Sequence, residues 1–242
     1  KNPNDGLLWV NHEYINPLFV SGYNYRDSKQ SKTKQQVNKE MYNVGGSIVR
    51  IRKENGKWEI VHNDPHNRRI TAKTPIKLNW DKPLKGKTIA IGTLANCSGG
   101  ITPWNTFLTC EENYDSFYGE IEYDENNNAT KIPSYYGYGW DKFYDYPPEH
   151  YGWVVEIDPK TGTAKKHIAL GRFAHECCTL FQLKDERIVA YTADDKNDEH
   201  LYKFVSSKPN SLKEGTLYVA DTINGIWLAL DWENQAILKS KF

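Results

Sequence analysis

Seven acidic or sulfur-bearing residues lie at or near the ends of apolar runs, and their side chains suit metal binding. They are Glu13, Cys97, Glu111, Glu112, Glu176, Asp194 and Asp195. Carboxylate oxygens are preferred by hard cations such as Ca²⁺, whereas a thiolate suits a transition metal such as iron. Like charges that are brought together must also be neutralised by cations. The pattern therefore predicts a mixed metal cluster, with a solvated turn residue as the alternative for each acid taken singly.

Two of these candidates are adjacent pairs, Glu111-Glu112 and Asp194-Asp195. Successive side chains of a regular strand point to opposite faces. We therefore expect only one member of each pair to reach a shared site, unless the strand breaks at that point.

A second candidate group lies in residues 171–176, which read GRFAHE. The guanidinium group of Arg172 offers the fork geometry that phosphate oxygens accept, so we interpret it as a substrate-binding anion clamp. His175 is then a candidate catalytic group beside the candidate ligand Glu176. The alternative is that His175 and Glu176 are a satisfied surface pair. The pair Arg68-Arg69 could also attract anions, and we interpret it as structural.

The sequence lacks the motifs that mark a side-chain nucleophile or a phosphate loop. Gly-x-Ser-x-Gly, a Walker-type loop and His-Glu-x-x-His are all absent. If the protein is a hydrolase, we expect water activated by a metal, rather than a side chain, to attack the substrate.

Composition excludes several classes of partner. Lys+Arg and Asp+Glu both number 31, so the net charge is zero and nothing favours nucleic acid or an anionic membrane. No stretch predicts a transmembrane span or a leader, and the first residue is Lys, which indicates a processed or truncated start.

We interpret Cys110, Cys177 and Cys178 as small buried apolar residues. Cys97 differs because it lies in a Gly-rich stretch that predicts a turn.

Aromatic, β-branched and turn residues predict many short strands. The expected strands are 7–15, 88–94, 106–110, 178–183, 187–193, 201–205 and 216–220, with hairpins over 45–63, 151–170 and 226–238, the last turning near Glu233-Asn234. Residues 24–44 predict a long exposed loop or a short surface helix. Residues 114–150 form a Tyr- and Pro-rich insertion, which we expect to cover the site.

Repeated antiparallel units without intervening helices indicate an all-β fold. Four apolar strands end in acid, within the segments LLWVNHE, FLTCEE, IVAYTADD and LYVAD. In a β-propeller, equivalent strand ends converge on one axial mouth, which would unite these distant acids in one site. We therefore predict one β-propeller domain over residues 1–242. A β-sandwich is the alternative, since it would show similar strands.

Several blocks of the sequence resemble the PhoX-type alkaline phosphatases, in the order in which that family has them. These blocks are residues 9–14 (WVNHEY), 67–71 (NRRIT), 88–113, 152–159 (GWVVEIDP), 171–176 (GRFAHE) and 215–220 (GTLYVA). The resemblance implies a β-propeller that is exported to the periplasm or cell surface and hydrolyses small phosphate monoesters. It also implies a cluster of ferric iron (Fe³⁺) and Ca²⁺. Cys97 would be the iron-bound thiolate, and the metal ligands would be Glu13, one or both of Glu111 and Glu112, Glu176, and Asp194 or Asp195.

Two features depart from the family pattern. Asp221 stands where the family usually has Arg, which predicts weakened or altered activity if that Arg holds phosphate. Members of the family are also much longer, so we expect an incomplete propeller or part of a longer chain.

The alternative functions are those of a non-enzymatic calcium-binding propeller that recognises a protein or glycan, and of a calcium-dependent propeller lactonase or phosphotriesterase. The sequence does not indicate an oligomeric state.

Overall fold

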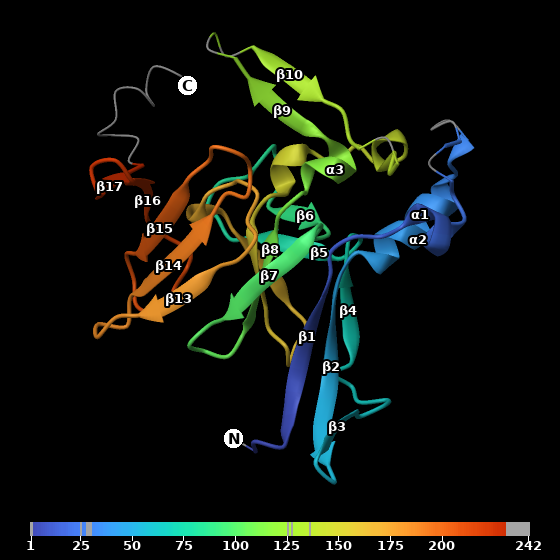
Figure 1. Ribbon diagram of the computed structural model, residues 1–242, viewed down its shortest axis with the longest axis horizontal. Helices are drawn as coiled ribbons and strands as arrows, with labels where there is room; N and C mark the ends of the chain where they lie inside the picture. The colour runs from blue at the N-terminus through green and yellow to red at the C-terminus, as the bar shows by residue number, and fades with distance from the viewer. Residues whose placement is uncertain are drawn as a thin grey trace.

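A computed structural model of the chain describes residues 2–24, 26–27, 31–124, 126, 128–135 and 137–230. The fold is mostly β-sheet, as the all-β prediction requires, with a few short helices on one side (Figure 1). Of the helices in these ranges, none has the length and apolar character needed to cross a membrane. The first arm of the predicted last hairpin is present, while its expected turn at Glu233-Asn234 falls outside the described residues.

Two antiparallel sheets and, between them, one mixed sheet make up the body of the molecule. The first sheet contains β1 (Asp5–His12), β2 (Gly45–Glu54), β3 (Lys57–Ile60) and β4 (Arg68–Thr71). The middle sheet has the order β6 (Ile89–Ile91), β5 (Pro75–Leu78), β12 (Ala164–His167), β11 (Val154–Ile157), β8 (Phe107–Glu111) and β7 (Asn96–Ile101). The third sheet has the order β13 (Thr179–Gln182), β14 (Ile188–Ala193), β15 (Leu201–Ser206), β16 (Gly215–Asp221) and β17 (Ile226–Ala229). The parallel pair is β5 with β12.

The three sheets stack with the middle sheet between the other two (Figure 1). One face of the middle sheet, with Val155 and Ile157, packs against Ile48 of the first sheet. The opposite face, with Leu108 and Val154, packs against the third sheet. Because side chains alternate along β11, its apolar residues supply both cores. The middle sheet is therefore covered on both faces, which accounts for the burial of every residue of β11.

The stretch around Cys97 is a strand, which corrects the predicted turn. Cys97, Ser98 and the two following glycines lie within β7, and the chain reverses at residues 102–106 instead. The glycines allow close approach between strands: a Cβ on Gly99 would lie 1.9 Å from the carbonyl oxygen of Leu108. Pairing between β7 and β8 is irregular from Asn96 to Gly99, and such a bulge redirects side chains at the edge of a sheet.

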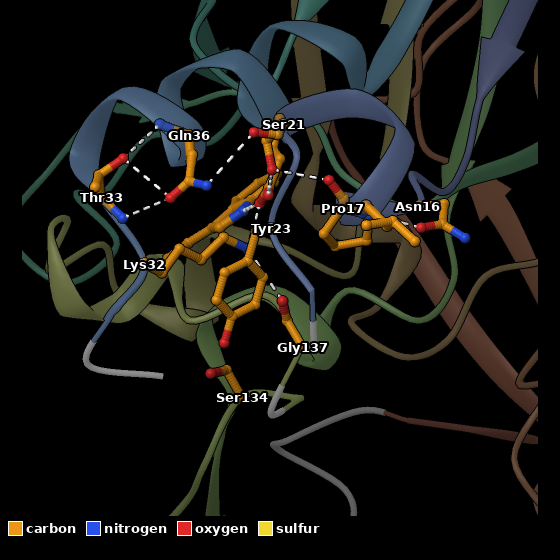
Figure 2. Close-up of polar contacts among 12 residues, drawn as sticks. Asn16, Pro17, Ser21, Tyr23, Lys32, Thr33, Gln36, Ser134 and Gly137 are labelled. Carbon is orange, nitrogen blue, oxygen red and sulfur yellow. Dashed lines mark hydrogen bonds and ion pairs between the residues drawn. The ribbon is translucent and has the colours of Figure 1, made fainter. Parts of the chain in front are cut away.

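Several described residues of the segment 24–44, which was predicted to be exposed, are buried, among them Lys32, Val37 and Glu40. Helix α1 (Pro17–Ser21) is followed by α2 (Lys34–Asn43), which begins with a capping box between Thr33 and Gln36 (Figure 2). Lys32 is buried, lies 2.7 Å from Glu40 of α2 and donates to the carbonyl oxygen of Gly137 (Figure 2). The polar residues of this segment predicted exposure. The prediction was wrong at Lys32 and Glu40 because they form a buried ion pair that anchors α2.

The insertion at residues 114–150 carries its own structure. It contains α3 (Asp115–Tyr118), the hairpin of β9 (Glu120–Tyr123) and β10 (Ala129–Ile132), and the 3₁₀ turns Trp140–Lys142 and Pro148–His150. Phe117, Tyr118 and Trp140 are buried together with Val37 and Met41 of α2. The aromatic residues of the insertion therefore form a core with α2. In Figure 1, α3 lies near the C-terminal end of β1, at the opposite end of the molecule from the N-terminus.

Glu156 has a buried carboxylate in β11 of the middle sheet, and its contacts stabilise the fold. It accepts hydrogen bonds from the indole of Trp104 (2.7 Å) and the hydroxyl of Thr106 (2.8 Å), and it lies 2.7 Å from His167 and 3.1 Å from Lys165. Burial alone would raise the pKa of Glu156. The bonds from His167 and Trp104 and the charge of Lys165 outweigh burial and lower this pKa from 4.5 to about 2.

This pKa predicts acid sensitivity. The folded-state pKa is below the usual value, so the stabilisation is present above pH 4.5 and is lost as the pH falls from 4.5 toward 2. We expect about 2–3 kcal/mol of the unfolding free energy to be lost across this window. Urea unfolding from pH 7 to pH 3 measures it. In Glu156→Gln the loss should be smaller, and equal losses in the two proteins would contradict the assignment.

Candidate metal centre

The inner edges of the three sheets meet at β1, β7 and β13, with β7 in contact with both of the others. The side-chain amide of Asn11, at the end of β1, donates a short hydrogen bond to the backbone carbonyl of Cys97 in β7. The backbone N–H of Ser98 donates to the carbonyl of Glu176, just before β13, at 2.9 Å. Segments that are far apart in the sequence are thus tied together around Cys97.

Three candidate ligands form one group at this point. Glu13 directly follows β1, Cys97 lies in β7, and Glu112 directly follows β8. One carboxylate oxygen of each Glu and the sulfur of Cys97 all lie within 4.8 Å of one another. The backbone N–H of Glu112 donates to the carbonyl of Ala95 at 3.1 Å, and the side chain of Asn113 donates to its carboxylate at 2.5 Å. The group is therefore built from residues of two sheets, and hydrogen bonds to Ala95 and Asn113 fix the position of Glu112.

The electrostatics of the group disfavour negative charge when no cation is bound. Burial, together with contact with Asp195 and the charge of Glu13, raises the pKa of Glu112 to about 7. Burial, contact with Glu112 and the nearby charges of Glu13 and Glu176 raise the pKa of Cys97 to about 12. Within the described ranges, no Lys or Arg side chain forms an ion pair with these four acids. Two carboxylates and a thiol without a cationic partner are a donor set that fits a metal ion.

Glu111 and Glu112 are separated as strand alternation predicts. The carboxylate of Glu111 is fully buried, lies 2.7 Å from Nζ of Lys166, and accepts from the backbone N–H groups of Leu94, Gly152 and Trp153 at 3.0–3.2 Å. These contacts engage both of its oxygens. Only Glu112 of the pair joins the group with Cys97, and Glu111 instead ties β8 to the chain around Gly152 and to β12.

The remaining acids lie around the group rather than in it. Glu176 and Asp195 are exposed and act on the pKa values of Cys97 and Glu112, respectively. Asp194 accepts from the backbone N–H of Lys196 at 3.1 Å and so closes the turn after β14. The second acidic pair is therefore also divided, with Asp195 on the side of the site.

His175 is engaged by the protein on both ring nitrogens. Nδ1 lies 2.9 Å from the hydroxyl of Thr192 and Nε2 lies 2.9 Å from the carbonyl of Gly171. Burial lowers the pKa of His175 to about 4, so the ring is neutral at physiological pH. Its centroid lies 3.7 Å from that of Phe173. These contacts fix the turn before β13, and they do not include a group of the candidate metal centre.

Arg172 is held by the insertion. Its Nη2 donates to both carboxylate oxygens of Glu120 at 2.8–2.9 Å and to the carbonyl of Pro148, and its Nε donates to the carbonyl of Tyr151. The guanidinium also lies over the ring of Tyr114, 4.8 Å from its centroid. The fork geometry that suggested a phosphate clamp thus binds a carboxylate of the protein itself.

Replacing Arg172 with Lys is expected to lower the free energy of unfolding by about 2 kcal/mol, because a lysine cannot reproduce these charge-assisted hydrogen bonds. Arg187→Lys is the matched control. Arg187 pairs with Asp185 on the surface, where an ion pair contributes about 1 kcal/mol at most. Equal effects of the two substitutions on urea unfolding would show that the Arg172 contacts do not stabilise the fold.

Sequence reasoning missed the residues that support the group. Asn11 also accepts from Thr109 (2.7 Å) and from the indole of Trp9 (2.6 Å), so its amide is oriented before it reaches Cys97. Asn113 orients Glu112. Both were visible as the Asn beside each acidic candidate, in Asn-His-Glu and Glu-Glu-Asn. Asp221, where the resemblance implies Arg, caps the turn between β16 and β17 by accepting from the backbone of Ile223 and from the backbone and side chain of Asn224.

Comparison with known proteins gives two matches. The family model described as "Alkaline phosphatase PhoX" matches residues 1–240. The solved structure of Pseudomonas fluorescens PhoX in complex with vanadate, a transition state analogue, is similar with a TM-score of 0.76 and 31% sequence identity. That similarity covers 94% of this chain and 46% of the solved chain, so this chain spans about half of its relative. Comparison with curated protein sequences finds no match. The family model, which covers nearly the whole chain, shows that this protein belongs to the PhoX alkaline phosphatase family.

Proposed function

We propose that this chain acts in a metal-dependent phosphomonoesterase, with small phosphate esters as substrates. The observation that carries the proposal is the group of Glu13, Cys97 and Glu112 where the three sheets meet. Family membership supports the reaction class. The solved relative binds vanadate as a transition state analogue, which fits a site built for phosphoryl transfer.

Ferric iron and calcium are the proposed cofactors, and the donor set divides between them by chemistry. The thiolate of Cys97 would hold iron, because sulfur ligands suit transition metals. Glu13 and Glu112 supply oxygens to the same group, and Glu176 and Asp195 add carboxylates beside it that suit calcium. When bound, such cations offset the negative charge that develops on a phosphoryl group during transfer.

The residues around the group hold these ligands in place. Asn113 orients Glu112, and Asn11 fixes the backbone of Cys97. We propose that Glu111, His175 and Arg172 are positioning residues: their contacts fix the end of β8, the turn before β13 and the insertion. Asp194 would act in the same way, through the turn after β14. Preorganised ligands of this kind are what a metal site requires of its surroundings.

We propose that the three sheets are consecutive blades of a β-propeller whose axis lies along β1, β7 and β13. Two observations support this. The sheets stack face to face, and their edge strands are neighbours at the point where the acidic residues gather. In this arrangement residues 114–150 would cover the mouth of the axis. The family also supports a periplasmic or secreted location, and the balanced charge gives no reason to expect nucleic acid as a partner.

Metal removal tests the function. A chelated and desalted sample should lose hydrolysis of p-nitrophenyl phosphate, and iron together with calcium should restore it. Calcium alone should not restore it, because a thiolate ligand indicates a second kind of metal. Full activity of the metal-stripped protein would refute the proposal. Binding of calcium alone, without hydrolysis, would favour a non-enzymatic calcium-binding propeller.

A further inference from the structure

A cleft of about 1180 Å³ opens between the middle sheet and the loop that joins β15 to β16. Strands β5, β6, β11 and β12 form its floor, and the turn between β7 and β8 and residues 210–213 form its walls. These segments belong to the middle sheet and to loops packed against it, so the outer faces of the first and third sheets take no part in the cleft.

The cleft is separate from the candidate metal centre. Trp104 and Thr106 line the cleft from the turn between β7 and β8, whereas Cys97 and Glu112 lie at the opposite ends of these two strands. The backbone of a strand advances about 3.4 Å per residue, so Thr106 and Glu112 are about 20 Å apart along β8. A ligand in the cleft would therefore not touch the metal ligands.

One row of side chains crosses the floor of the cleft. Glu156 on β11 pairs with Lys165 on β12. Lys165 pairs in turn with Lys77 on β5, which pairs with Ile89 on the edge strand β6. Because paired residues of neighbouring strands share a face of a sheet, these side chains lie next to one another in the lining. The row therefore places two ammonium groups side by side, with an apolar side chain beyond them.

The positive charge of this row is only partly offset. The carboxylate of Glu156 lies 3.1 Å from Lys165, but it is shared with His167, at 2.7 Å. Among the residues that the structure describes, no carboxylate forms an ion pair with Lys77. Like charges on neighbouring strands destabilise a sheet, so an anion bound between Lys77 and Lys165 would remove a repulsion.

The other acids near the row are engaged elsewhere. Asp158 lines the cleft, but its carboxylate accepts from the backbone N–H of Lys160 at 2.8 Å and closes the turn after β11. Asp81 lies 2.6 Å from Lys213 of the wall. The bond from Lys213 lowers the pKa of Asp81, and the charge of Lys77 contributes without forming an ion pair. Neither acid therefore neutralises the pair of lysines directly.

Apolar side chains complete the lining. Ile89 is 50% exposed, and Pro75, Trp104 and Leu212 line other parts of the cleft. Ligand sites are typically concave and largely apolar, with a few polar groups that orient the ligand. Lysine ammonium groups bind carboxylate and phosphate groups as point charges. A charged pair beside apolar surface suits a ligand that has an acidic group and an apolar part.

We infer that this cleft binds a small organic anion. Its acidic group lies between Lys77 and Lys165, and its apolar part lies against Ile89. Carboxylate and phosphate groups share the required chemistry. The site is a second one, apart from the candidate metal centre, and the inference does not rest on the proposed activity.

Displacement of the fluorescent anion anilinonaphthalene sulfonate tests the inference, because this probe joins an acidic group to an aromatic body. We measure the part of its fluorescence that benzoate displaces. In Lys77→Gln the dissociation constant of this part should rise at least about tenfold, since a charge-assisted hydrogen bond is lost. Lys160→Gln is the matched control: Lys160 is exposed, lies outside the lining, and its loss should leave the affinity unchanged. Lys165→Gln modifies the same pair if Lys77→Gln does not fold by circular dichroism.

Competitors test the two parts of the ligand separately. Benzyl alcohol lacks the charge and should not displace the probe, and orthophosphate lacks the apolar part and should require a concentration at least about tenfold higher than benzoate. Phenylphosphonate is compared with benzoate, and the tighter competitor identifies the acidic group as phosphate-like or carboxylate. Displacement by benzyl alcohol or orthophosphate as effective as that by benzoate would overturn the inference. The absence of any displaceable probe, or wild-type affinity in both Lys77→Gln and Lys165→Gln, would also overturn it.

Discussion

Replacing Cys97 with alanine is expected to abolish the proposed phosphatase activity and to remove the proposed iron from the protein. The sulfur is the one soft donor in the group with Glu13 and Glu112, and a methyl group cannot replace it. Loss of a ligand that holds a catalytic metal should lower kcat/KM by at least about 10³-fold, which corresponds to about 4 kcal/mol of transition-state stabilisation. Hydrolysis of p-nitrophenyl phosphate and the iron content of the same sample are the two measurements.

Cys177→Ala is the matched control for this prediction. Cys177 is exposed, in contrast to its predicted burial, and does not belong to the group. It should keep both iron and activity, and thermal unfolding should show that Cys97→Ala is folded. A folded Cys97→Ala protein with wild-type iron content would mean that the sulfur is not a ligand.

Replacing Glu111 with alanine is expected to have the largest effect on stability. Glu111 and Lys166 are both fully buried and lie 2.7 Å apart, so the substitution leaves a buried ammonium without its carboxylate. Removing one partner of a buried ion pair costs about 3–5 kcal/mol. Three backbone N–H groups also lose their acceptor, which adds to the loss.

A double-mutant cycle isolates the charge from the lost packing. Lys166→Met removes the ammonium and keeps most of its volume, so Glu111→Ala should cost less in the Lys166→Met background than in the wild type. Urea unfolding of the four proteins gives the coupling energy. Equal costs in the two backgrounds would show that the ion pair contributes nothing.

The sequence predicted the strands well because period-2 patterns and turn residues are local signals. The hairpins at 45–63 and 151–170 and the strands of the third sheet occur where they were expected. The predicted turn at Cys97 was wrong, because a glycine needed for close strand packing reads the same as a glycine needed for a turn. Gly99 serves the first purpose, against Leu108.

The sequence predicted which kinds of residue form the candidate site, but not the contacts of each of them. Glu13, Cys97 and Glu112 come together from three segments, and strand alternation separated Glu111 from Glu112. The contacts of Arg172 and His175 could not be foreseen, because their partners Glu120 and Thr192 are fixed only by the tertiary fold. Residue type indicates what a side chain can bind, while the fold decides which partner reaches it.

Anomalous diffraction tests most directly whether Glu13, Cys97 and Glu112 bind a shared metal ion. Crystals of the protein, purified without chelator, would be measured on both sides of the iron absorption edge. We expect an iron peak about 2.3 Å from the sulfur of Cys97, a typical metal–thiolate distance, with the carboxylates of Glu13 and Glu112 around the metal cluster. An iron peak elsewhere, or no metal density among these three side chains in an active protein, would contradict the proposed site.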